Sequence, residues 1–132
     1  MKILATVDFS TTSESILRIT KTYAKKMGAE VFLVHAEPAQ TAVSQDEYDT
    51  KPEAMRLRRD ALALEKAGVK VTSVFVEGPA CDTILSEALR LKVDLIITGA
   101  HGHGGANCKA SVGHISECIL LRSKIPVMVV PV

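Results

Sequence analysis

Aromatic residues, cysteines and net charge are all scarce in this sequence. Aromatic side chains make up 4% of the 132 residues, with no tryptophan, while hydrophobic residues reach 47%, so a core must be mainly aliphatic. The formal net charge of +1 argues against binding to nucleic acid or to a membrane surface, since both call for a basic excess. No apolar run reaches the ~18 residues that a membrane helix requires. At this length we expect one domain, over residues 1–132.

The three cysteines are Cys81, Cys108 and Cys118, too few for a disulfide framework. No signal peptide is expected either, because Asp8 interrupts the apolar stretch at the start. Both features favour a reducing cytoplasm. Cys81 and Cys118 fall on apolar faces of expected helices, and we interpret them as packing residues. Cys108, in a glycine-rich stretch, is the candidate for exposure and reactivity.

Five short apolar runs, rich in β-branched residues, are typical of strands covered on both faces. They span 3–7, 31–35, 71–76, 95–98 and 127–130. Helical patterns separate them, and the residues expected to face the core are Ile16, Ile19, Tyr23 and Met27; Ala54, Leu57, Ala61 and Leu64; Cys81, Ile84, Leu85 and Ala88; and Val112, Ile115, Cys118 and Ile119. This alternation predicts an α/β fold with an open, five-stranded parallel sheet and helices on both faces. Ligands of such sheets bind beyond the carboxyl ends of the strands, at the switch in strand order.

A glycine-rich stretch, TGAHGHGGANCKASVGHIS, joins the fourth expected strand to the last expected helix over residues 98–116. Its glycines are Gly99, Gly102, Gly104, Gly105 and Gly113. Glycine lets backbone amides approach a ligand closely, and a helix N-terminus adds further N–H groups. The stretch therefore predicts an anion site suited to a phosphate.

All four histidines fall near the same expected edge of the sheet: His35, His101, His103 and His114. With Cys108, the last three offer nitrogen and sulfur ligands of the kind that Zn²⁺ takes, although their spacing is not a recognised structural zinc pattern. His103 or His114 could instead contact a phosphate. A metal- or redox-responsive regulator that uses His101, His103, Cys108 and His114 therefore stays open as an alternative.

Catalytic signatures are lacking. No Gly-Lys-Ser/Thr occurs, so the lysine of a Walker A motif is missing. No nucleophile, base and orienting acid can be assigned together. We expect a binding protein without catalytic residues, with slow ATP hydrolysis at most.

Taken together, the motifs resemble those of the universal stress protein family over nearly the whole chain. The similar stretches are KILATVDFS, VFLVHAEPA, GPACDTILSEAL, DLIITGAHGHGG, GHISECIL and KIPVMVVPV. The resemblance implies strand order 3-2-1-4-5, of the adenine nucleotide alpha hydrolase-like type, and a homodimer. Many members bind ATP through G-x2-G-x9-G followed by Ser or Thr. The resemblance thus implies a cytoplasmic stress-response protein that binds ATP or AMP, with Mg²⁺ as a possible companion.

The resemblance also assigns site residues. Asp8 is similar to the acid beside the nucleoside, Thr6 and Val7 would offer backbone contacts, and Val34 would meet the adenine. The residues around the phosphates would be Gly99, Ala100, His101, Gly102, His103, Gly113, His114, Ile115 and Ser116. Here Gly113 follows Gly102 after ten residues instead of nine, and His114 stands where the family has Ser or Thr. These departures keep open a stress protein without a nucleotide, acting through protein partners.

The last expected strand contains Val127, Met128, Val129 and Val130, all apolar. At the edge of a sheet, such a strand favours pairing with another chain. In the family the final strands of two subunits pair antiparallel, so the resemblance implies a dimer interface here. Pro131, which lacks an N–H group, would end the ladder.

Overall fold

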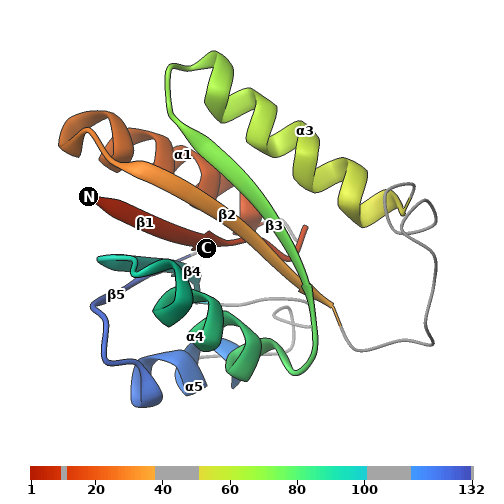
Figure 1. Cartoon of the computed structure of the whole chain (residues 1–132), viewed down its shortest axis with the longest axis vertical. Helices are drawn as coiled ribbons and strands as arrows, with labels where there is room; N and C mark the ends of the chain where they lie inside the picture. The colour runs from red at the N-terminus through yellow and green to blue at the C-terminus, as the bar shows by residue number, and fades with distance from the viewer. Residues whose placement is uncertain (10–11, 38–50, 101–113, 132) are drawn as a thin grey trace.

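A parallel sheet lies between two layers of helices in the computed structural model, which describes residues 1–9, 12–37, 51–100 and 114–131 (Figure 1). The strands are β1 (Lys2–Thr6), β2 (Glu30–Glu37), β3 (Val71–Glu77), β4 (Leu95–Gly99) and β5 (Val127–Val130). The helices are α1 (Thr12–Met27), α3 (Pro52–Lys66), α4 (Ala80–Leu91) and α5 (His114–Arg122). In these ranges no helix is both long enough and apolar enough to cross a membrane.

The strand order is β3-β2-β1-β4-β5, and every neighbouring pair is parallel. This confirms the predicted fold class and order. β1 is the central strand, where Ile3 pairs with Val31 of β2 on one side and with Leu95 of β4 on the other. The carboxyl ends of all five strands therefore meet at one edge of the sheet.

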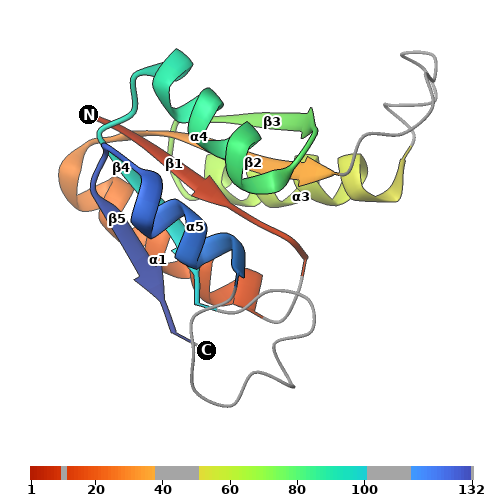
Figure 2. The same ribbon diagram turned by 90° about the horizontal axis from the view of Figure 1, so that it is seen from below.

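The two faces of the sheet are covered by different helices, as the two views in Figures 1 and 2 show. Successive residues of β1 alternate between the two hydrophobic clusters, because side chains alternate across a strand. Ile3 and Ala5 pack with α1 and α3, whereas Leu4 packs with α4 and α5. All three side chains are fully buried. Double coverage explains why the strands read as continuous apolar runs and not as alternating ones.

The second predicted helix is confirmed in detail: Ala54, Leu57, Ala61 and Leu64 are its buried residues. The last predicted helix is confirmed only in part. It begins at His114, and Ile115, expected to face the core, is 48% exposed. Ile119, also expected to face the core, is buried as predicted, and Ser116 is buried as well. Val112 lies outside the described residues. Met27, expected on the inner face of the first helix, is also exposed, because it is the last residue of α1.

Cys81 and Cys118 form a disulfide between α4 and α5, with their Cα atoms 6.2 Å apart. The prediction that these cysteines only fill space in the core was wrong. They are 37 residues apart in the sequence, and only the packing of both helices on one face of the sheet brings them together.

Gly78 joins β3 to α4 and has a φ of +137°. Residues other than glycine rarely adopt this backbone conformation. A Cβ atom there would lie 2.7 Å from Oγ1 of Thr83. Gly28, which follows α1, also has a positive φ, +61°, but a Cβ there would meet nothing within 4 Å.

We therefore expect Gly78→Ala to lower the free energy of unfolding by about 2–3 kcal/mol, since backbone strain and crowding add. The control Gly28→Ala should lower the free energy of unfolding by ~1 kcal/mol, because its Cβ adds the strain of a left-handed backbone and no steric contact. Urea denaturation of both variants measures the difference. Equal losses would contradict the role given to Thr83.

Candidate functional site

The carboxyl edge of β1 and β4 is the point at which the chain leaves the sheet in opposite directions. β1 leads to α1 on one face, and β4 leads toward α5 on the other. The hydroxyl groups of Thr6 and Thr98 are joined across these strand ends by a hydrogen bond of 3.0 Å. This is the switch in strand order at which sheets of this type bind ligands.

Asp8 lies in a tight turn just beyond β1. Phe9 has a left-handed φ of 63°, uncommon for a residue other than glycine and a form of strain found often at functional sites. The buried Ser13 holds this turn from the first part of α1: its Oγ accepts from the N–H of Phe9 at 3.0 Å and donates to Oδ1 of Asp8 at 3.4 Å. The turn thus fixes a carboxylate at the strand end.

His35 is a buried titratable group beside this turn, 6% exposed. Nδ1 of its ring lies 2.7 Å from the carbonyl oxygen of Val7, and Nε2 lies 2.7 Å from Oε1 of Glu37. A carbonyl oxygen only accepts, so Nδ1 must donate. The carboxylate of Glu37 is the partner of the other ring nitrogen, so both nitrogens of this buried ring are satisfied.

Two aromatic rings pack against His35, and a guanidinium packs on one of them. The rings of Phe9 and Phe75 have their centroids 4.4 Å and 5.5 Å from that of His35. From α3, Arg56 places its guanidinium carbon 4.7 Å above the Phe9 ring, and Nη2 donates to the Phe9 carbonyl at 3.2 Å. This arrangement brings a positive charge to the edge that carries Asp8.

The charge of Arg56 also acts along α3. Burial raises the pKa of Asp60, and the positive charges of Arg59 and Arg56 oppose that rise. Desolvation is the larger of these effects.

The other side of the site is the junction between β4 and α5. Ser116, 5% exposed, donates its hydroxyl hydrogen to the carbonyl oxygen of Gly99 and so ties the first turn of α5 to the end of β4. The N–H of Ala100 donates to the carbonyl of Val130 at 2.9 Å. His114 and Ile115 are exposed at the start of α5.

The described residues of the predicted nucleotide site all lie at this edge. Those on β2, at the end of β1 and just beyond it are Val34, Thr6, Val7 and Asp8; those at the end of β4, just beyond it and in the first turn of α5 are Gly99, Ala100, His114, Ile115 and Ser116. The backbone of Val7 already has partners, because its N–H donates to the carbonyl of Val34 at 3.0 Å and its own carbonyl contacts His35. The remaining predicted residues, His101, Gly102, His103 and Gly113, lie outside the described residues.

The zinc hypothesis depends on His101, His103 and Cys108, which also lie outside the described residues, and on His114. Among the residues that are described, no group of three or more His, Cys, Asp or Glu side chains is placed to hold a metal ion.

Sequence reasoning missed the packing of Phe9, Phe75 and Arg56 around His35. One signal was available: the chain has only three phenylalanines, and two of them gather here.

Comparison with known proteins gives a consistent result. Residues 1–131 match the model of the universal stress protein family. A universal stress protein of Methanocaldococcus jannaschii is 26% identical over 152 aligned residues, covering 98% of this chain and 93% of the relative. A solved structure of that protein matches with a TM-score of 0.81 at 28% identity, covering 99% of this chain and 95% of that one.

Two solved complexes share the fold. A universal stress protein of Archaeoglobus fulgidus in complex with dAMP has a TM-score of 0.75 at 20% identity, covering 98% of this chain and 96% of that one. A universal stress protein in complex with cAMP has a TM-score of 0.74 at 19% identity, and the match covers 99% of this chain and 96% of that one.

The pairing of His35 with Glu37 predicts an asymmetry between two neighbouring glutamates. Glu37 and Glu77 are register partners on β2 and β3, but Glu77 is more exposed, and among the described residues its ion pair is with Lys51, at 4.0 Å. Glu37→Ala leaves a buried ring nitrogen without its partner and should lower the free energy of unfolding by about 1–3 kcal/mol. Glu77→Ala should lower the free energy of unfolding by less than ~1 kcal/mol, because an ion pair that is partly open to solvent contributes little. Chemical denaturation at pH 7 compares them, and equal losses would show that the buried pair adds nothing.

Proposed function

The chain belongs to the universal stress protein family, and on that premise we propose that it binds an adenine nucleotide at the carboxyl edge of β1 and β4. The observation that supports this most is the fixed carboxylate of Asp8 at the switch in strand order. Members of the same fold bind dAMP and cAMP. We propose a role in the stress response of the cytoplasm.

The geometry supplies both kinds of group that a nucleotide needs. A carboxylate accepts hydrogen bonds from ribose hydroxyls, and Ser13 holds that of Asp8 in place. Positive charge for the phosphates is supplied by Arg56 and by the N-terminus of α5, where the first backbone N–H groups of a helix face outward. His114, exposed in that first turn, adds a polar ring.

The nucleotide we propose is ATP or AMP, with Mg²⁺ accompanying ATP. The glycine-rich stretch that begins at Gly99 would supply the backbone amides for its phosphates. The described residues assign no nucleophile or general base, so we propose binding without a dedicated hydrolytic step.

A stress protein that acts through protein partners without a nucleotide is the second candidate. The bond between Ser116 and Gly99 favours it, because the hydroxyl expected to reach a phosphate is already used inside the protein. The backbone N–H of Val7 is likewise used within the sheet.

Asp8→Asn separates the two candidates. It keeps the shape of the side chain but removes its charge, and it should weaken ATP and AMP binding by about tenfold or more, the loss of a charged hydrogen bond. The matched control is Asp94→Asn at the opposite edge of the sheet, where an amide oxygen can still accept from the N–H of Lys2. Isothermal titration calorimetry measures both. No binding by the unaltered protein would leave the partner-based role.

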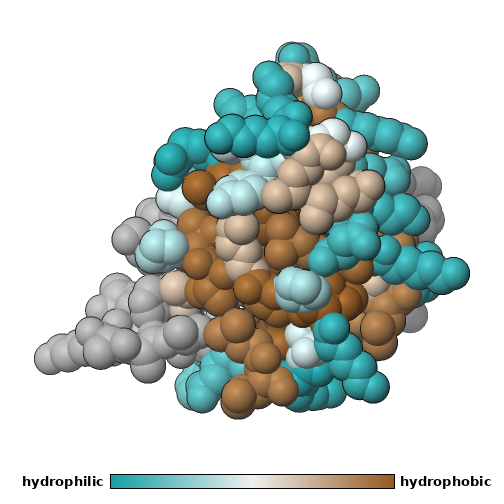
Figure 3. Space-filling view, turned by 90° about the vertical axis from the view of Figure 1, so that its left-hand side faces the viewer, coloured by the Kyte–Doolittle hydropathy of each residue, from teal (hydrophilic) through white to brown (hydrophobic). Residues whose placement is uncertain are grey.

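We also propose a homodimer formed through β5. This strand is at the edge of the sheet, and Val127, Met128 and Val129 are only partly buried. β5 lies on the left-hand side of Figure 1, and Figure 3 shows that side of the molecule. A broad hydrophobic area is exposed on it. An apolar edge with open backbone groups favours pairing with a second copy of the same edge.

Val129→Lys should therefore convert the dimer to a monomer, because the lysine would carry its charge into the pairing edge. Thr72→Lys is the control, since Thr72 is exposed on β3, the opposite edge strand. Sedimentation velocity gives the mass of each variant. A dimer that survives Val129→Lys would place the interface elsewhere.

A further inference from the structure

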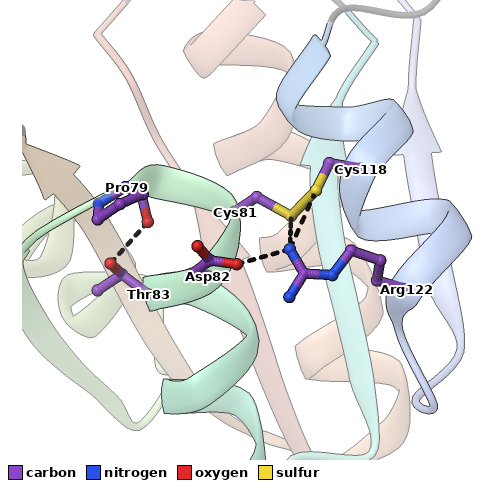
Figure 4. A network of polar contacts seen from close by, with 6 residues as sticks. All are labelled: Pro79, Cys81, Asp82, Thr83, Cys118 and Arg122. Atoms are coloured by element: carbon purple, nitrogen blue, oxygen red, sulfur yellow. Dashed lines mark hydrogen bonds and ion pairs between the residues drawn. A yellow bond between two sulfur atoms is a disulfide. The ribbon is translucent and has the colours of Figure 1, made fainter.

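The disulfide between Cys81 and Cys118 lies on the surface of the helix layer formed by α4 and α5 (Figure 4). Cys81 is the second residue of α4, and Cys118 lies in the middle of α5. Both residues are partly exposed. External thiols can therefore approach this bond, in contrast to one sealed in the core.

The guanidinium group of Arg122 lies beside both sulfur atoms. Arg122, one helical turn after Cys118, places Nη1 3.8 Å from Sγ of Cys81 and 3.6 Å from Sγ of Cys118. Asp82 holds the guanidinium there, with Oδ1 2.5 Å from the same nitrogen. Figure 4 shows this side chain reaching from α5 to the first turn of α4. A nearby cation stabilises the thiolate form, which is both the nucleophile and the better leaving group.

The first turn of α4 adds a second stabilising field, and it acts on Cys81 alone. The positive end of a helix dipole favours an anion in the first turn. Thr83 closes that turn by donating its hydroxyl to the carbonyl of Pro79 at 2.7 Å. Cys118, in the middle of α5, has no such position. The two sulfurs therefore differ, and Cys81 is the one that leaves more easily as a thiolate.

We propose that Cys81 and Cys118 are a redox-active pair, which exchanges with small thiols in the folded protein and braces α5 against α4 when oxidised. A thiolate of a small dithiol attacks Sγ of Cys118, and the electron pair of the broken S–S bond goes to Sγ of Cys81. The second thiol of the reagent then displaces Cys118. The protein bond gains two electrons and two protons, and the reagent becomes a disulfide. A small disulfide reverses the step and leaves as two thiols.

The brace acts close to the proposed ligand edge. Cys118 is two residues after Ser116, whose hydroxyl holds the start of α5 to Gly99. Ile119, fully buried, is the main hydrophobic anchor of this nine-residue helix. Reduction removes the covalent tie and leaves α5 held by that anchor, by the Ser116 hydrogen bond and by the ion pair of Arg122 with Asp82. Thiol exchange at this pair does not depend on nucleotide binding.

Thiol counting on the native full chain tests the exchange. In Cys108→Ser protein, mass spectrometry after alkylation should find no free thiol under glutathione disulfide and two under dithiothreitol, with unchanged far-ultraviolet circular dichroism. Cys81→Ser in the same background cannot close the bond, so its one thiol should carry glutathione under glutathione disulfide and be free under dithiothreitol. Free thiols under glutathione disulfide, or a bond reduced only after denaturation, would overturn the proposal.

The rate of reduction tests the guanidinium. Arg122→Gln should slow reduction by dithiothreitol by about three- to tenfold, because the leaving thiolate loses its cation. Arg90→Gln, which removes an exposed arginine paired with Glu87, should leave the rate unchanged. Equal rates in all three proteins would contradict the role of Arg122. Amide hydrogen exchange in α5 should be faster in the reduced protein, and identical exchange in both states would refute the brace.

Discussion

Burial of the central strand on both faces is the constraint from which the rest of this structure follows. Ile3, Leu4 and Ala5 are successive residues, so their side chains point to opposite faces, yet none is exposed. A strand of this kind needs helices above and below, and parallel pairing needs a crossover after every strand. The crossovers leave β1 and β4 toward different faces and thereby create the edge that carries Asp8.

The site gains rigidity from groups that are themselves buried. His35 has both nitrogens in short contacts, and the Phe9 ring packs against it. This packing supports the left-handed backbone of Phe9, and Ser13 completes the turn by accepting the Phe9 N–H. The carboxylate of Asp8 is thus held by the Ser13 hydroxyl, in a turn whose Phe9 ring packs against the buried His35.

The sequence predicted the parts of the molecule that periodicity controls. The strand positions, the sheet type and the inner face of α3 are local patterns, and all were correct. The errors arose where a contact between distant parts of the chain decides which side chain is buried or paired. Ser116 takes an inner position on α5 because a carbonyl of β4 lies within reach, and Ile115 is displaced to the surface. The packing of the helices brings Cys81 next to Cys118 and Arg56 next to Phe9. The spacing of these residues along the chain does not predict either contact.

The disulfide also changes the connectivity of the chain. Its two cysteines enclose a covalent ring that contains α4, β4 and the whole glycine-rich stretch up to α5. While the bond is intact, a protease that cuts once between Gly99 and His114 opens this ring without severing the molecule, because α5 and β5 stay covalently attached to the rest. A single cleavage there yields a nicked protein of full mass, and two separate fragments appear only after reduction.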